Sequence, residues 1–478
     1  MYHQPALFIG DRWRDANGGR RRPVVNPATE EILGEAPVAD AADVAEAIAT
    51  AEAGYKAWSR THGWERAKVL RAIARRMDAR RAELAMALTL EVGRPLAQSD
   101  GEVQIALEQF DWFAGEAERL FGENIPSRQG GMLIIDHEPV GVVAAFSAWN
   151  FPINLPARKI APALAAGCSI IVRPSEQTPS TTRILVECCL EGGVPPAAIQ
   201  LVTGNAEELS GAIMASPIVR KISLTGSTAV GQQLLARAAE TVKRCSMELG
   251  GHSPVIVCDD VDVEAVAALC GQFKFRNAGQ VCISPNRFYV HESVAPAFKK
   301  TFVEYAKNLK LGDGREADTT MGPLTTPRQL DRIEALSAET EASGARRLTG
   351  GRRPTGTNKG YFFEPTVFED VPDDARIMHD EPFGPVAPIN TFRDIDQAIE
   401  RANDTNYGLA AYVFTRDLGR AQHLSRNIRT GMVGVNTFAI AHAEAPFGGV
   451  DYSGMGREGG RQAIHDYLNV KLSHFIAE

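Results

Sequence analysis

The chain has 478 residues, of which 44% are hydrophobic and 23% charged, and its formal net charge at pH 7 is −8. This composition is typical of a folded protein with several domains and large cores, and it excludes a disordered chain. The acidic balance lacks the basic excess that neutralises phosphates, so we expect no nucleic-acid partner. Without a long uninterrupted apolar stretch or a signal-peptide pattern, we expect no membrane partner and a cytoplasmic location.

The first 120 residues have helical periodicity. Apolar residues recur every three or four positions in 40–58, 66–88 and 103–121, and Asp40 or Asp43 is a candidate N-cap for the first of these helices. From residue 132 onward, short β-branched segments alternate with helical ones. The expected strands are 132–138, 141–147, 169–174, 199–204, 220–226, 242–249 and 254–258. This alternation predicts βαβ units and a doubly wound parallel sheet.

A second α/β series follows Pro254. It begins with a helix over 263–275 and ends around 431–437. Two further segments, 126–140 and 465–475, are extended and apolar at alternate positions, but lie at the margins of both series. Exposed β edges of this kind usually need a covering partner, so we expect an arm and a homodimer or homotetramer.

Seven cysteines are scattered along the chain with no CxxC pair. This pattern favours reduced thiols over disulfides and gives no metal-ligand spacing, so we expect no metal. Polar flanks and Gly279 place Cys282 on a loop, where it is either a nucleophile or an inert core residue. Asn150, at the end of one expected strand, can donate to an oxyanion, and Glu248, at the end of another, can act as a base.

Two strand ends carry residues suited to a dinucleotide. Residues 221–235 predict a strand, a turn at Gly226 and a helix from Thr228, whose free N–H groups can face a pyrophosphate. The same residues equally fit a capped turn. One strand earlier, Glu176 can accept hydrogen bonds from ribose hydroxyls and repel a 2′-phosphate, which favours NAD over NADP. The literal GxGxxG match at 454–459 lacks the expected helical context and is interpreted as a glycine-rich turn.

Six motifs occur together: WNFP, LTGSTAVG, MELGGHSP, NAGQVC, DEPFGPV and PFGG…SGMGREGG. In this order and spacing they resemble the NAD(P)-dependent aldehyde dehydrogenase superfamily over nearly the whole chain. The resemblance implies that Cys282 is the nucleophile, that Glu248 activates water, and that Asn150 holds the oxyanion with the Cys282 backbone N–H. A CoA-acylating dehydrogenase and a non-catalytic protein are the alternatives. Glu248 argues against the first, and the complete set of reactive groups argues against the second.

The resemblance also implies an NAD site. Glu381 and Phe383 match positions at the nicotinamide ribose and ring, and Lys159 and Glu176 match positions at the adenosine ribose. Arg173 stands where the family usually has lysine, which affects cofactor affinity because a planar guanidinium differs from a point ammonium. The other implied cofactor-binding residues are Trp149, Gly226, Ser227 and Leu249.

The substrate is indicated by two arginines. Arg276 lies six residues before Cys282, and Arg158 lies eight after Asn150. In the succinate semialdehyde dehydrogenase group, arginines at these places hold the distal carboxylate; pairing with acidic neighbours is the alternative. We expect oxidation of succinate semialdehyde, with 2-oxoglutarate or glutarate semialdehyde as the alternative and a broad aldehyde range less favoured. Many members of this group carry a second cysteine where Ser284 stands, so no regulatory disulfide is expected.

The predicted fold class is therefore α/β. An NAD-binding domain with a doubly wound parallel sheet comprises 1–119 and 140–250, and an α/β catalytic domain comprises 251–455. Residues 120–139 and 456–478 form a small β oligomerisation arm.

Overall fold

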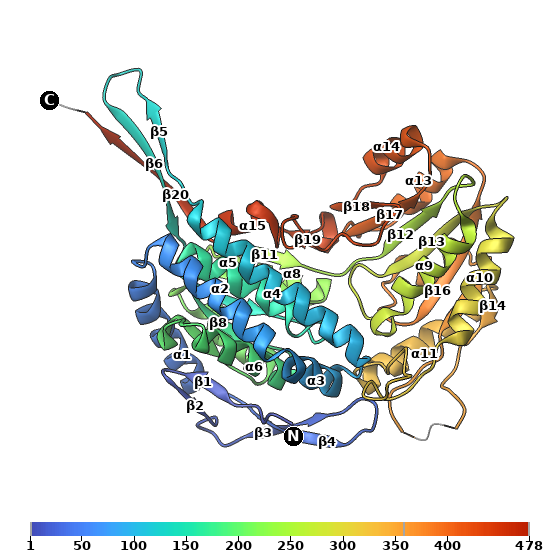
Figure 1. Cartoon of the computed structure of the whole chain (residues 1–478), viewed down its shortest axis with the longest axis horizontal. Coiled ribbons are helices and arrows are strands. Elements are labelled where there is room, and N and C mark those ends of the chain that lie inside the picture. The colour runs from blue at the N-terminus through green and yellow to red at the C-terminus, as the bar shows by residue number, and fades with distance from the viewer. Residues whose placement is uncertain (1, 357–358, 477–478) are drawn as a thin grey trace.

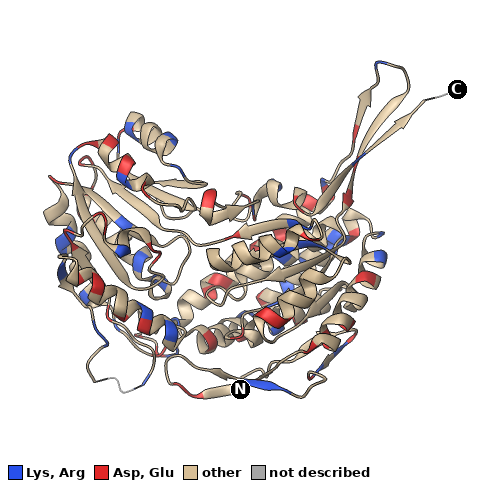
Figure 2. Ribbon diagram, turned by 180° about the vertical axis from the view of Figure 1, so that it is seen from behind, with Lys and Arg blue, Asp and Glu red and all other residues tan. Residues whose placement is uncertain are grey.

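The computed structural model describes residues 2–356 and 359–476. Two large sheets with their surrounding helices form two lobes, and a narrow three-stranded arm projects from the first lobe (Figure 1). Acidic and basic residues are interspersed over both lobes (Figure 2). Among the helices of the described ranges, none combines the length and the apolar character of a membrane span.

The first sheet has eight strands in the spatial order β19, β11, β10, β7, β8, β9, β1, β2. The five strands from β11 to β9 are parallel, and the three at the margins are antiparallel. Their bounds are β1 (Leu7–Ile9), β2 (Arg12–Arg14), β7 (Val142–Phe146), β8 (Ser169–Arg173), β9 (Ile199–Leu201), β10 (Val219–Thr225), β11 (Arg244–Glu248) and β19 (Gly454–Met455). From β7 the chain adds β8 and β9 on one side, and it then returns to add β10 and β11 on the other side of β7. Ligands of doubly wound folds bind outside the strand ends at such a reversal.

Both faces of this sheet are buried, as expected for parallel strands. Val143 and Ala145 of β7 enter one core, whereas Val142 and Ala144 enter a second core on the opposite face. The helices of this lobe are α1 (Ala41–Trp58), α2 (Gly63–Ala79), α3 (Arg81–Val92), α4 (Leu96–Glu118), α5 (Asn154–Ala166), α6 (Pro179–Glu191), α7 (Ala206–Ala215), α8 (Thr228–Ala239) and α15 (Gly460–His465).

The second sheet has the spatial order β14, β15, β16, β13, β12, β17, β18, and only β14 is antiparallel to its neighbour. Its strands are β12 (Ser253–Val257), β13 (Pro285–His291), β14 (Arg346–Thr349), β15 (Thr366–Glu369), β16 (Val386–Phe392), β17 (Ala410–Phe414) and β18 (Met432–Val435). Its helices are α9 (Val263–Phe275), α10 (Ala295–Asn308), α11 (Pro327–Ala342), α12 (Arg376–His379), α13 (Ile395–Asn403) and α14 (Leu418–Asn427).

The arm is an antiparallel sheet of β5 (Glu123–Pro126), β6 (Met132–Pro139) and β20 (Leu468–Phe475). β6 pairs with β20 along its whole length, from Pro139 with Leu468 to Met132 with Phe475. The two segments at the margins of the predicted domains therefore lie side by side (Figure 1). The α/β fold class and its small antiparallel sheet are confirmed. The domain boundaries stay a prediction, although β19 pairs with β11 in the first sheet rather than with the second.

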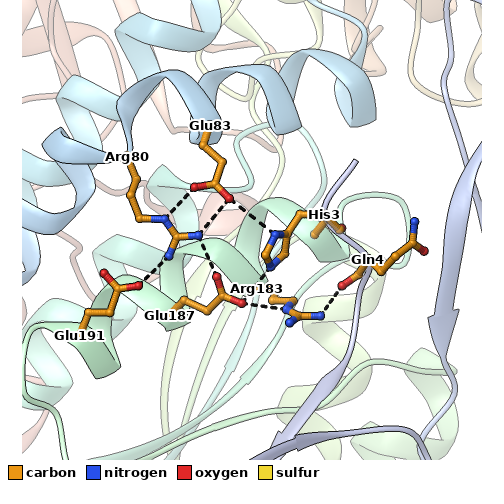
Figure 3. Close-up of polar contacts among 8 residues, drawn as sticks. His3, Gln4, Arg80, Glu83, Arg183, Glu187 and Glu191 are labelled. Atoms are coloured by element: carbon orange, nitrogen blue, oxygen red, sulfur yellow. Dashed lines mark hydrogen bonds and ion pairs between the residues drawn. The ribbon is translucent and has the colours of Figure 1, made fainter. Parts of the chain in front are cut away.

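The expected helix over 66–88 is wrong as one element, because α2 ends and α3 begins at Arg80. The break brings the Arg80 guanidinium to three carboxylates: Nε lies 2.7 Å from Glu83, and Nη2 and Nη1 lie 2.8 and 3.0 Å from Glu187 and Glu191. Figure 3 shows His3 between Glu83 and Glu187 in the same network. The network ties the start of the chain to α3 and α6. The helix over 40–58 is confirmed, with a capping box at Asp40.

Candidate active site

Cys282 follows a strained turn at the end of α9. Asn277, Ala278 and Gly279 all have left-handed backbones, with φ of 50°, 52° and 73°. A β-carbon at Gly279 would clash with the carbonyl oxygen of Gly384, so this position requires glycine. The Asn277 side chain braces the turn by donating to the Gln280 carbonyl at 3.2 Å. Backbone strain of this kind concentrates at functional sites, and here it presents a half-buried cysteine.

Asn150 lies beside this turn, just past the end of β7. Its side chain is buried, and its Nδ2 donates to the Gln280 carbonyl at 3.1 Å. An amide nitrogen carries two hydrogens, so the second one remains available for an oxyanion. The structure therefore brings Asn150 to the nucleophile loop, as expected from the sequence.

Glu248 is the last residue of β11 and is also buried. Its Oε2 has no hydrogen-bond partner among the described residues. Burial raises the pKa of Glu248 well above its usual range, and the charge of Glu458 adds to this effect, while Lys159 and Arg158 oppose it. A carboxyl group with a raised pKa is suited to accept a proton near neutral pH.

Lys159 lies in a buried ion pair that the sequence did not indicate. It is fully buried on α5, where its Nζ donates to Thr225 Oγ1 at 2.6 Å and pairs with Glu458. Two of the three ammonium hydrogens are accounted for by these groups, and the role of Lys159 at the adenosine ribose stays a prediction. Its ion pair sets the charge around Glu248. Sequence reasoning missed Glu458, whose only signal was the glycine-rich segment that contains it.

The Cys282 thiol is protonated in this arrangement. Burial raises its pKa to about 12; Glu381 and Glu248 add to the rise, and Arg158 opposes it. A thiol attacks carbonyl carbon as the thiolate, so a neighbouring group has to take its proton. Glu248 and Glu381 are the carboxyl groups that face it.

Trp149, Glu381 and Phe383 form one end of the expected cofactor site. The rings of Trp149 and Phe383 meet edge to face with centroids 5.5 Å apart, and Phe383 has a left-handed backbone with φ of 51°. Gln329 fixes this backbone by donating to the Phe383 carbonyl at 2.6 Å. Glu381 Oε1 is buried without a partner among the described residues, and burial raises its pKa to about 8. An unpartnered acceptor beside an aromatic pair fits a ribose hydroxyl.

The turn into α8 fits the pyrophosphate. Ser227 caps the helix by accepting from the Val230 N–H. A β-carbon at Gly226 would lie 3.3 Å from the Leu224 side chain, and the free N–H groups of the first turn of α8 suit an anion. Leu249 packs against α8, where a β-carbon at Gly231 would lie 2.5 Å from it.

Arg173 and Glu176 follow β8, which is on the other side of β7 from this turn. Arg173 Nη2 lies 3.2 Å from Glu176 Oε1, and Arg22 pairs with the other oxygen of the same carboxylate. Sequence reasoning missed Arg22. The unpartnered oxygen of Glu381, the N-terminus of α8 and the Glu176 carboxylate together fit a dinucleotide.

Arg158 and Arg276 are held by aromatic rings. The Arg276 guanidinium lies 5.8 Å from the Phe151 ring and 5.5 Å from the Phe273 ring, and Arg158 lies 4.8 Å from the Phe447 ring. Such contacts orient a guanidinium without neutralising it. Neither arginine forms an ion pair with any carboxylate of residues 2–356 and 359–476, although Glu458 and Glu248 act electrostatically on Arg158, and the role of the two arginines toward a substrate carboxylate stays a prediction. The aromatic contacts had no signal in the sequence.

Residues 13–473 match the family described as "Aldehyde dehydrogenase family". The chain belongs to this family. It is 42% identical to the 3-sulfolactaldehyde dehydrogenase of Pseudomonas putida, over 97% of this chain and 95% of that protein. It is 40% identical to the NADP-dependent succinate-semialdehyde dehydrogenase GabD of Escherichia coli, over 98% and 97% of the two chains.

A solved structure of succinate-semialdehyde dehydrogenase from Burkholderia pseudomallei superimposes with a TM-score of 0.96 and 41% identity, over 98% of this chain and 97% of that one. The family resemblance inferred from the motifs is therefore confirmed, and the protein is an NAD(P)-dependent aldehyde dehydrogenase that acts on an aldehyde substrate.

Proposed function

We propose that this aldehyde dehydrogenase oxidises a short aldehyde with an anionic group at its far end, succinate semialdehyde first, and that it prefers NAD⁺. The observation that carries the proposal is a pair of guanidinium groups, that of Arg158 buried and that of Arg276 half-buried, neither of which forms an ion pair with a carboxylate of the described residues. A buried charge without a partner is costly, and an anionic substrate relieves that cost.

The reaction begins when the Cys282 thiol loses its proton to a facing carboxylate and its sulfur bonds to the aldehyde carbon. The carbonyl oxygen becomes an oxyanion, and the second hydrogen of Asn150 Nδ2 and the Cys282 N–H donate to it. Removal of one such donor raises the barrier by roughly 3 kcal/mol. NAD(P)⁺ held by Trp149, Glu381 and Phe383 would supply the acceptor for the hydride of this carbon, and Cys282 then carries the acyl group as a thioester.

Glu248 completes the turnover. Its carboxylate takes a proton from water, the resulting hydroxide attacks the thioester carbon, and the carbon–sulfur bond breaks to release the acid and the Cys282 thiolate. Lys159, in its ion pair with Glu458, limits how far the pKa of Glu248 rises, because its ammonium charge favours the ionised carboxylate, whereas the charge of Glu458 raises that pKa.

The named relatives support an anionic substrate while differing in its length. Their names refer to succinate semialdehyde, glutarate semialdehyde and 3-sulfolactaldehyde, and each of these carries a carboxylate or a sulfonate away from the aldehyde. Guanidinium groups bind both kinds of oxyanion. Glutarate or 2-oxoglutarate semialdehyde is therefore the second candidate.

The arm supports a homodimer or homotetramer. Val470, Leu472 and Phe475 of β20 expose large apolar surfaces. A projecting sheet with such a face needs a covering partner, and a second copy of the chain supplies the same edge. Light scattering of the wild type and of Leu472→Asp tests this, since the substitution is expected to lower the measured mass.

The substrate proposal is tested by comparing kcat/KM for succinate semialdehyde and for butanal, which has the same chain length without the carboxylate. Arg276→Ala is expected to lower the value for succinate semialdehyde by about 100-fold and the value for butanal by less than about threefold, since only the first loses a charge-assisted hydrogen bond. Arg12→Ala, a change of an exposed arginine on β2, is the control. Equal losses on both aldehydes would show that Arg276 is structural.

A further inference from the structure

Arg22 lies on a short hairpin of β3 (Arg21–Val25) and β4 (Ile32–Pro37), 154 positions before Glu176. Its Nη1 contacts Glu176 Oε2. The neighbouring Arg21 pairs instead with Asp15, with Nη2 2.7 Å from Oδ2. Successive residues of a strand point to opposite faces, which explains why only one of the two arginines reaches Glu176.

Glu176 is thus held from two sides. Arg173 Nη2 lies 3.2 Å from its Oε1 and also donates to the Gly204 carbonyl at 3.0 Å, while Arg173 Nε is buried without a partner among the described residues. Burial lowers the pKa of Arg173 to about 10, and the like charge of Arg22 contributes to the shift. Two cations therefore surround one anion, and the cluster keeps one surplus positive charge.

This surplus alters the repulsion that an isolated Glu176 would exert on NADP⁺. A carboxylate alone disfavours a second anion beside the ribose. Arg22 can offset that repulsion because its side chain is 54% exposed, and an exposed ion pair costs little to break. Its planar guanidinium also matches the geometry of a phosphate.

We propose that Arg22 is a specificity-determining residue for the cofactor: it stays on Glu176 when NAD⁺ is bound and turns to the 2′-phosphate when NADP⁺ is bound. Arg173, fixed by Gly204, supplies the second cation. The enzyme then accepts NADP⁺ as a second cofactor in spite of Glu176. This inference rests on the proposed placement of the adenosine ribose at Glu176.

The first experiment measures binding without catalysis. Adenosine 2′,5′-bisphosphate and 5′-AMP differ only in the 2′-phosphate, and their Kd values are measured by calorimetry on wild type, Arg22→Ala and Arg21→Ala. Arg22→Ala is expected to raise the Kd of the bisphosphate about five- to tenfold and to leave that of 5′-AMP within about twofold, because only the phosphate loses a charged donor. Arg21→Ala is expected to change neither.

The second experiment separates the two proposals. Glu176→Gln is expected to lower the Kd of the bisphosphate, because it removes the repulsion of the 2′-phosphate. It is expected to raise the Kd of 5′-AMP, because it removes an acceptor for the ribose hydroxyls. If Glu176→Gln changes the Kd of neither nucleotide, the adenosine ribose does not lie at Glu176. The placement of the ribose and the role of Arg22 are then both overturned. If Glu176→Gln behaves as expected but Arg22→Ala leaves the bisphosphate unchanged, or weakens both nucleotides equally, the role of Arg22 alone is overturned.

Kinetics with the full cofactors give an independent readout. The ratio of kcat/KM for NADP⁺ to that for NAD⁺ is expected to fall about five- to tenfold in Arg22→Ala, with Arg22→Lys intermediate because it keeps the charge and loses the fork. An unchanged ratio in Arg22→Ala contradicts the proposal.

Discussion

The catalytic end and the adenosine end of the proposed cofactor site use charge in opposite ways. At the catalytic end, Glu248 and Glu381 each have a buried oxygen without a partner among the residues that the structure describes, and burial raises the pKa of both. At the adenosine end, Glu176 has an arginine on each of its oxygens, one of them half exposed. Unpartnered burial keeps a group ready to exchange protons, whereas ion pairing keeps it charged for recognition.

The largest effect should come from the group that reacts. Cys282→Ser is expected to lower kcat by about 10⁴-fold or more, because a hydroxyl is a far weaker nucleophile at neutral pH. Cys245→Ser, a change of a half-buried cysteine on β11, is the matched control and should leave kcat nearly unchanged. Initial-rate assays by NADH absorbance measure both. Substantial activity in Cys282→Ser would contradict the assignment of Cys282 as the nucleophile.

Glu248→Gln should have the next largest effect, about 10²- to 10³-fold on kcat, because it removes a general base. The loss should fall on thioester hydrolysis, so rapid mixing with NAD⁺ and aldehyde should still give a burst of NADH of about one per site. A slow reaction without a burst would assign Glu248 to the earlier step instead.

A moderate effect is expected from pH. The pKa of Cys282 is about 12 and that of Glu248 is raised, and both act after losing a proton. The deprotonated fraction of an acid below its pKa grows with pH, so kcat/KM should rise between pH 6 and about 9. Recognition at the ion-paired Glu176 should not follow this rise, so the Kd of 5′-AMP should stay flat. A kcat/KM that falls as the pH rises would contradict the raised pKa values of Cys282 and Glu248.

The smallest effect is expected at the surface near the adenosine end. Arg20 and Glu208 form an exposed ion pair at 3.0 Å. Arg20→Ala should change the free energy of unfolding by less than about 0.5 kcal/mol and leave both cofactors' kinetics unchanged. Denaturant titration measures the first. A selective loss of NADP⁺ activity in this variant would mean that the overall electrostatic field of the surface, rather than Arg22, sets the preference between NAD⁺ and NADP⁺.

The sequence was sufficient to predict the fold class, because helical and strand periodicities are local and both faces of the parallel sheets are apolar. It also located Cys282, Asn150 and Glu248, since each follows a recognisable strand or turn. The Lys159–Glu458 pair could not be predicted because its two members are 299 positions apart and only the folded chain brings them together. The Arg22–Glu176 pair escaped notice for the same reason.

Aromatic contacts were equally beyond prediction. Phe273 lies on α9 just before Arg276, whereas Phe151 lies far earlier in the chain, and nothing in their spacing indicates a common contact. The break at Arg80 was missed because apolar periodicity continues through it. The break brings Arg80 to carboxylates of α3 and α6, and the contacts with α6 exist only in the folded chain.

Arg158 belongs to α5 of the first lobe, and Arg276 follows α9 of the second. On the proposed function, an anionic substrate held by both becomes a temporary brace between the lobes, whereas an uncharged aldehyde does not. Substrate binding would then stiffen the whole enzyme, and amide hydrogen exchange in α5 and α9 would slow with succinate and not with butyramide.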